Sequence, residues 1–241
     1  MKACHSIVPV FDEANLVSAA GLVPVLELAG RAGLEDLLGK HLSVASPNAV
    51  DKARSVVAGM LAGADSIDDL DLLRAGGMAR LVAGVRAPST LGTFLRTFTH
   101  GHVQQVDKIS AAVLAGLTGQ LPGLLAGGRG AEGMVFVDVD DTIRAVHGYA
   151  KQAAGFGYSK VRGLNVQLAT VSTPTAAPVI ARARLRRGNV SSHAGAPRLI
   201  AQAMTTARAA GARGQVMVRA DSAYYLRDVL ATALRHGRGT R

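Results

Sequence analysis

The hydrophobic pattern of this chain changes its period once, and that change constrains the fold more than any other feature. Before residue 123, apolar residues recur at the spacing of amphipathic helices, in Leu22–Leu28, Val50–Leu61 and Ile109–Leu117. After residue 133 they alternate with polar residues or form short β-branched runs, as in strands. The segment 123–133 holds five glycines in eleven residues. We therefore expect a helical region, residues 1–130, followed by an α/β domain, residues 134–241.

The second half predicts strands and helices in the order β-β-β-α-β-α. A helix is expected to begin near Pro197 and to end at Gly211, and a last helix to follow Leu226. Three strands precede the first helix and one lies between the two helices: Met134–Val139, Leu164–Ser172, Val179–Leu185 and Val216–Arg219. A series of hairpins followed by a helical crossover gives a mixed sheet.

Positive charge is concentrated in the second half. Residues 135–241 hold 16 Lys and Arg against five aspartates, and no glutamate follows Glu132. Such a domain favours a polymer of phosphates as its partner. Aromatic residues make up only 4% of the chain, so the composition predicts no aromatic-rich stacking surface, and the single Cys4 excludes a disulfide framework or a Cys-based zinc site.

Four of those five aspartates lie at two predicted strand ends. Asp140 stands where the first strand is expected to end, with Asp138 on the same face, and Asp221 follows Val216–Arg219. If these strands are parallel neighbours, Asp140 and Asp221 emerge at the same end of the sheet, where carboxylates suit Mg²⁺ or Mn²⁺. The alternative is that these aspartates are turn residues and helix caps, with Asp221 capping the helix after it.

Several segments together resemble the DDE transposases of bacterial insertion sequences, and most nearly the group named after insertion sequence thirteen-eighty. The resemblance lies in VDVDDT, HGY, GFGYSKVRGL, VRADSAYY and the upstream APSTLGTFLRTF, at Val137–Thr142, His147–Tyr149, Gly155–Leu164, Val218–Tyr225 and Ala87–Phe98.

The resemblance implies a ribonuclease H-like core in which Asp140 is the first catalytic aspartate, Asp138 its reserve candidate and Asp221 the second. In the family these carboxylates hold two divalent ions, Mg²⁺ or Mn²⁺, for phosphoryl transfer on DNA. The implied partners are transposon inverted-repeat ends, target DNA and a second copy of the chain.

The family's third carboxylate is a glutamate on a later helix, and this sequence has none after Glu132. We therefore expect an incomplete ribonuclease H-like sheet and a truncated catalytic domain that lacks the third carboxylate, in a DNA transposase that cuts and joins transposon ends. One alternative is a non-catalytic DNA-binding remnant. Another is a haloacid-dehalogenase-type phosphatase with Asp138 as nucleophile and Asp140 as acid/base, although no later acidic pair matches that class.

Six basic residues are candidates for DNA contact: Lys160 and Arg162 in a turn between strands, and Arg182, Arg184, Arg186 and Arg187 in the third strand. The other interpretation of the four arginines is a solvated strand face. The uncharged run Ile109–Gly128 has the length of a membrane span, but its polar residues, proline and glycines favour a core helix and a loop. The sequence thus predicts a cytoplasmic, nucleoid-associated protein.

Overall fold

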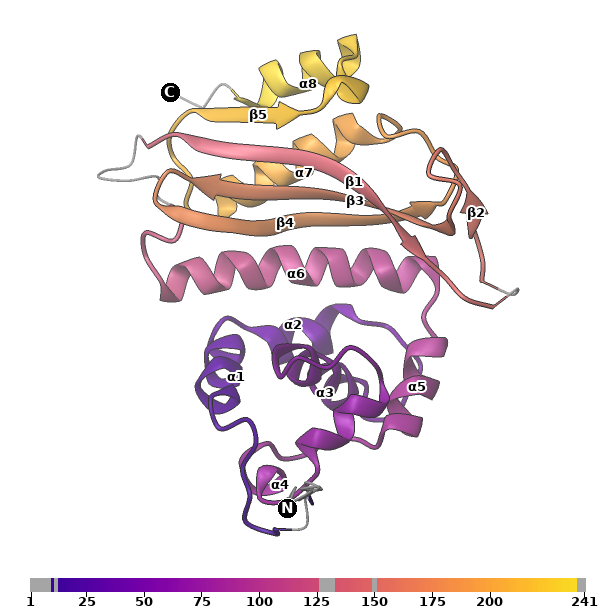
Figure 1. The fold of residues 1–241 in the computed structure, drawn as a ribbon. Coiled ribbons are helices and arrows are strands. Elements are labelled where there is room, and N and C mark those ends of the chain that lie inside the picture. Colours follow the sequence, from indigo (N-terminus) through magenta and orange to yellow (C-terminus); the bar gives the residue numbers. More distant parts are fainter. Residues whose placement is uncertain (1–9, 11–12, 126–132, 149–150, 238–241) are drawn as a thin grey trace, which may run out of the picture.

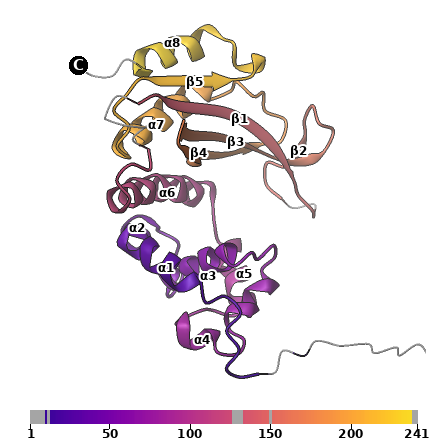
Figure 2. The ribbon, with the colours of Figure 1, turned by 60° about the vertical axis from the view of Figure 1, so that its left-hand side comes forward.

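The computed structural model describes residue 10 and residues 13–125, 133–148 and 151–237. A helical region lies beside a mixed sheet, and the long helix α6 separates the two (Figure 1). A view turned by 60° shows the same arrangement (Figure 2). Most of the glycine-rich segment 123–133 lies outside the described residues.

The first half is helical, as its periodicity predicts. Its helices are α1 (Leu22–Arg31), α2 (Leu34–His41), α3 (Ala49–Leu61), the 3₁₀ turn η1 (Asp68–Leu73), α4 (Met78–Leu81), α5 (Pro88–Arg96) and α6 (His100–Gln120). The last begins earlier than its apolar stretch suggests, because Thr99 and His102 form a capping box at its start.

The second half contains a five-stranded sheet and two α-helices. The elements are β1 (Val135–Ala145), β2 (Gly155–Phe156), β3 (Arg162–Thr173), β4 (Ala176–Arg187), α7 (Ala196–Ala209), β5 (Val216–Ala220), the 3₁₀ turn η2 (Ser222–Tyr224) and α8 (Arg227–Gly237). This confirms the predicted order, with the two-residue β2 added.

The central strands lie in the order β4-β3-β1-β5. Strand β3 pairs antiparallel with both β1 and β4, whereas β5 returns through α7 to pair parallel with β1. Strand β2 pairs with the first residues of β3. The crossover therefore brings the carboxyl ends of β1 and β5 to the same end of the sheet.

One face of the sheet is covered by α7, which lies behind the strands in Figure 1. Val135, Val137 and Val139 of β1 point to this face and are buried against Leu199 and Met204 of the helix. Because side chains alternate along a strand, Phe136, Asp138 and Asp140 point to the opposite face, called here the open face. Exposed Ile180, Leu185 and Met217 also lie on it by register.

Helix α6 packs against both halves of the molecule. Its Ile109 belongs to the core of the helical region, whereas its Leu114 belongs to the core beneath the sheet. No helix among the described residues is long and apolar enough to cross a membrane. The described part of Ile109–Gly128 forms the second half of α6 and the turns after it.

Candidate active site

Strand β1 is longer than the sequence predicts. The expected end at Asp140 is wrong, because β1 continues to Ala145 and Asp140 pairs with Leu168 of β3. The extension exists because β3 also continues, to Gly163, and supplies a partner for each added residue. Asp140 therefore sits on a regular strand rather than in a turn, and its position is fixed by the ladder.

Asp140 and Asp221 each follow the last paired position of two parallel strands. The register of β1 and β5 ends with Val139 opposite Ala220, and the two aspartates come next. Both residues are exposed. Oδ1 of Asp140 accepts a hydrogen bond from the backbone N–H of Asp141 at 2.7 Å. The structure thus brings both predicted carboxylates to one end of the sheet.

Asp221 also has the capping role that the sequence left open. Its Oδ1 accepts a hydrogen bond from the backbone N–H of Ala223 at 3.0 Å, which caps the short turn η2 rather than α8. The cap engages Oδ1 of this exposed carboxylate. Capping and ion binding are therefore compatible at this carboxylate.

Asp138 lies on the same face but differs in its bonding. Arg219, its neighbour on β5, donates from Nε to Oδ1 at 2.5 Å and from Nη2 to Oδ2 at 2.7 Å. The hydrogen bonds that Arg219 donates to Asp138 raise the pKa of Arg219, whose guanidinium also lies 4.3 Å from the centre of the Phe136 ring. Because one guanidinium engages both oxygens of Asp138, Asp140 is better placed to bind an ion.

The donor set at the strand ends fits a hard divalent cation in part. Carboxylate oxygens are the ligands that Mg²⁺ and Mn²⁺ prefer, and the exposure of both residues leaves room for water ligands. Within the described residues no group of three or more His, Cys, Asp or Glu could hold a metal. A cation at these strand ends would therefore have two carboxylates of the described residues as ligands, those of Asp140 and Asp221.

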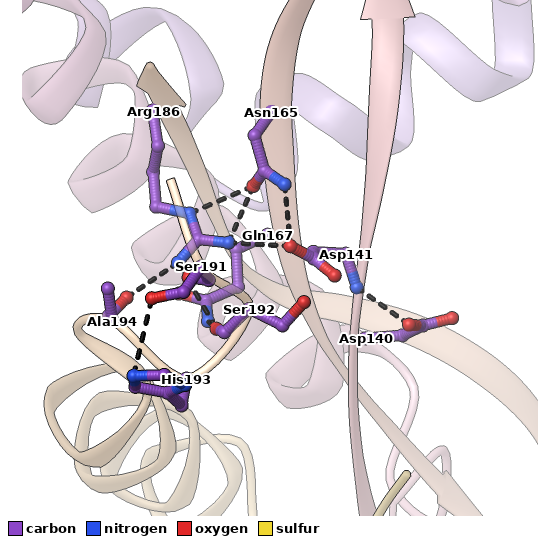
Figure 3. Close-up of polar contacts among 9 residues, drawn as sticks. All are labelled: Asp140, Asp141, Asn165, Gln167, Arg186, Ser191, Ser192, His193 and Ala194. Carbon is purple, nitrogen blue, oxygen red and sulfur yellow. Dashed lines mark hydrogen bonds and ion pairs between the residues drawn. The ribbon is translucent and has the colours of Figure 1, made fainter. Parts of the chain in front are cut away.

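Asp141 faces the opposite way and belongs to a buried polar network (Figure 3). Its Oδ2 accepts hydrogen bonds from Nδ2 of Asn165 at 2.5 Å and from Nη2 of Arg186 at 2.8 Å. The side chains of Asp141 and Arg186 are only 13% and 11% exposed. The network ties β1, β3 and β4 together directly behind Asp140.

Arg186 extends this network to the loop before α7. Its Nη1 donates to the carbonyl oxygens of Ser191, Ser192 and Ala194. Burial lowers the pKa of Arg186, and the charge of Asp141 opposes that shift. Burial likewise raises the pKa of Tyr224, which lies near this pair, to about 12. Tyr224 is neutral at pH 7 with or without this shift, so it adds no second negative charge.

Three of the predicted DNA-binding arginines point inward. Arg182 contacts Asp107 of α6 and Thr206 of α7, and Arg184 contacts Gln202 and the carbonyl of Gly195. With Arg186 they occupy the α7 face, because the register places them opposite Ala169, Gln167 and Asn165. These three arginines do not form a solvated strand face: their side chains join the sheet to the helices and to the loop before α7.

The other three candidates lie at the carboxyl end of β1. Lys160 and Arg187 are exposed, and Arg162 is partly buried with its Nη1 donating to the carbonyl of Gly148 at 2.8 Å. Arg187 directly follows Arg186 in β4. Because side chains alternate along a strand, Arg187 points to the open face, opposite Leu164.

Three antiparallel strands, a crossover helix and a fourth strand parallel to the first are consistent with a ribonuclease H-like fold. The transposase DDE domain group 1 family matches residues 2–239, and the chain belongs to this family of DDE transposase domains. No curated protein and no solved structure matches the chain. The family implies DNA as the partner.

Proposed function

We propose that this chain acts on DNA as a DDE transposase, with Asp140 and Asp221 holding the divalent cation, Mg²⁺ or Mn²⁺, that phosphoryl transfer requires. The observation that supports the proposal is the parallel register of β1 and β5, which ends one residue before Asp140 in β1 and one residue before Asp221 after β5. Exposure of both residues leaves that end accessible to a DNA phosphate.

Each carboxylate has a defined part in this proposal. Asp140 is held by the β1–β3 ladder and by the buried network behind it, and Asp221 is held by its cap on η2. Asp140 and Asp221 would hold a divalent cation between them, which would supply activation of a water or a 3′-hydroxyl and neutralisation of charge on the phosphodiester. Arg219 keeps Asp138 neutralised beside the pair, which limits repulsion among three neighbouring carboxylates.

The proposed site is tested by Mn²⁺ binding to the intact chain, followed by electron paramagnetic resonance. We expect Asp140→Asn and Asp221→Asn each to weaken Mn²⁺ binding by about tenfold or more, because each removes one of two anionic ligands. Asp228→Asn is the matched control, since Asp228 is an exposed aspartate on α8 with the same change in charge. Equal Mn²⁺ affinity in all four proteins contradicts the site.

The reserve role of Asp138 has its own outcome in the same titration. Asp138→Asn is expected to leave most of the Mn²⁺ affinity, since Arg219 already binds both oxygens of Asp138. A loss as large as that of Asp140→Asn moves the first ligand to Asp138. The phosphatase alternative, which needs Asp138 as a free nucleophile, finds no support in this geometry.

The two-carboxylate site favours one further candidate, a DNA-binding protein that occupies transposon ends without cutting them. Incubation of supercoiled plasmid with the chain and Mn²⁺ separates the two: nicking abolished by Asp140→Asn supports the enzyme, and binding without nicking supports the remnant. The same proposal includes three further points: assignment to the insertion sequence thirteen-eighty group, an accessory DNA-binding role for residues 1–130, and a homodimer.

A further inference from the structure

A short arm extends from the sheet at the carboxyl end of β1. It consists of residues 142–148 of β1 and its continuation, and residues 151–163, which include β2 and the turn into β3. Figures 1 and 2 both place β2 beyond the end of β5, on the side toward which β1 runs. The arm therefore starts beside the end of the sheet that carries Asp140 and Asp221.

Glycines hold the arm against the rest of the sheet. A Cβ at Gly157 would lie 2.5 Å from the carbonyl oxygen of Gly188, one at Gly163 would lie 2.4 Å from that of Arg144, and one at Gly188 would lie 2.1 Å from that of Gly163. No side chain fits at such distances, so these backbones pack directly on one another. The glycine spacing of GFGYSKVRG serves this close packing, not a phosphate-binding loop.

Two aromatic residues alternate with these glycines and point outward. Phe156 is 67% exposed and Tyr158 is 105% exposed. Gly155, just before Phe156, and Gly157, between the two rings, are partly buried. Large apolar rings held in water on a well-packed backbone are typical of a surface that contacts a binding partner. The aromatic content of the chain, 4%, did not predict this pair, because composition does not show where individual rings lie.

The arm presents Phe156 on the same face as Asp140. Leu164 of β3 points to the open face, and Arg144 and Arg187 lie opposite it on the two neighbouring strands. Arg162 is two residues before Leu164 and therefore points to the same face. Phe156 lies opposite Arg162, so its ring is on the open face as well. Asp140 reaches that face four residues before Arg144 in β1. The Phe156 ring, three cations and the carboxylate of Asp140 thus share one face of the sheet.

The charge around the rings matches a nucleic acid backbone. No acidic residue occurs between Asp141 and Asp221 in the sequence. The arm and its border carry only cations: Arg144, Lys151, Lys160, Arg162 and Arg187. Cations that follow a phosphate backbone, combined with exposed rings on which bases stack, are the two components of single-strand binding.

We propose that the arm binds unpaired DNA bases by stacking them on Phe156 and Tyr158, beside the phosphate at Asp140 and Asp221. Asp140 lies five residues before Ala145, and Ala145 and Gly155, the neighbour of Phe156, both pair with Gly163 of β3. Five residues span about 17 Å along a strand, which is about five base steps along DNA. The arm would then hold a strand opened near the cut. The inference rests on the proposed function, since it names the form of DNA that the same site takes.

The test measures binding in EDTA, so that it does not depend on the metal site. The probes are a blunt DNA duplex and the same duplex with one end unpaired and carrying 2-aminopurine. We expect Phe156→Leu and Tyr158→Leu each to weaken binding of the unpaired probe by about fivefold or more, and to reduce quenching of its 2-aminopurine. Binding of the blunt duplex should change less than twofold.

Conservative and remote variants separate stacking from a general loss. Phe156→Tyr and Tyr158→Phe keep the ring and should keep the affinity, and Leu234→Ala removes an exposed apolar side chain on α8, far along the sequence from the arm, with no effect. Both leucine variants should fold, because the rings they replace are exposed; circular dichroism verifies this.

Each other outcome overturns the inference in a recognisable way. Unchanged binding by the leucine variants, or an equal loss on both probes, removes the stacking role and leaves the proposed function intact. A change in oligomeric state without a change in DNA binding identifies a second copy as the occupant. A wild-type chain that binds neither probe overturns both the inference and the proposed function.

Discussion

At the scale of single residues, Asp140 and Asp141 are neighbours in β1 with opposite surroundings. Strand alternation turns Asp140 to the open face, where it is exposed, and Asp141 to the α7 face, where Arg186 and Asn165 bind it. A carboxylate that accepts a cation needs solvent access, whereas one that supports a strand needs permanent partners. The pair divides these two requirements between adjacent positions.

The buried pair predicts a large difference between two adjacent arginines. Arg186→Met should lower the free energy of unfolding by about 3–5 kcal/mol, because it leaves the carboxylate of Asp141 buried without its cation. Arg187→Met, the matched control, should change it by less than about 0.5 kcal/mol, since Arg187 is exposed. Urea denaturation followed by circular dichroism measures both, and equal effects contradict the assignment of Arg186 to the network.

The sequence predicted the carboxylates at residue level but not the network. Asp140 and Asp221 could be found because each follows a recognisable apolar run. The sequence predicts that the first strand ends at Asp140, so strand alternation does not extend to Asp141 and its partners Asn165 and Arg186. Those partners lie 24 and 45 positions away, and only the β1–β3–β4 register brings them together.

At the scale of secondary structure elements, α6 determines how the two halves are joined. Asp107 on α6 accepts hydrogen bonds from Nη1 of Arg182 at 2.9 Å and from the backbone N–H of Ala183 at 3.0 Å. The periodicity correctly predicted a helix here, and also most strands, since each signal is local. The docking of α6 on β4 was not predictable, because its partners are 75 and 76 positions apart.

Removal of this carboxylate tests the docking. Asp107→Ala should lower the free energy of unfolding by about 3 kcal/mol or more, because Arg182 is left mostly buried without its anion and the N–H of Ala183 loses its acceptor. Asp71→Ala breaks a second Asp–Arg pair, with Arg74, which is largely exposed, and should cost less than about 1 kcal/mol. Thermal or urea unfolding compares them, and similar losses argue against α6 as a structural joint.

At the scale of the whole molecule, the excess of positive charge has two distinct uses. Arg182, Arg184 and Arg186 neutralise or bind internal groups on the α7 face. Lys160 and Arg187 remain exposed at the carboxyl end of β1, toward Asp140. Net charge alone therefore overstates the number of cations that can meet DNA, and the strand register indicates which ones can.

This division predicts the salt dependence of DNA binding. The logarithm of the affinity for duplex DNA should fall linearly with the logarithm of salt concentration, and Lys160→Ala and Arg187→Ala should each reduce the magnitude of the slope by about 1. Arg213→Ala removes the same charge from an exposed residue before β5, at the other end of that strand from Asp221, and should leave the slope unchanged. Fluorescence anisotropy measures the DNA affinity of all four proteins between about 50 and 200 mM salt, a range over which counterion release lowers the affinity. If Arg213→Ala reduces the slope equally, DNA affinity depends on the total charge of the chain. That result would contradict DNA contact at the carboxyl end of β1.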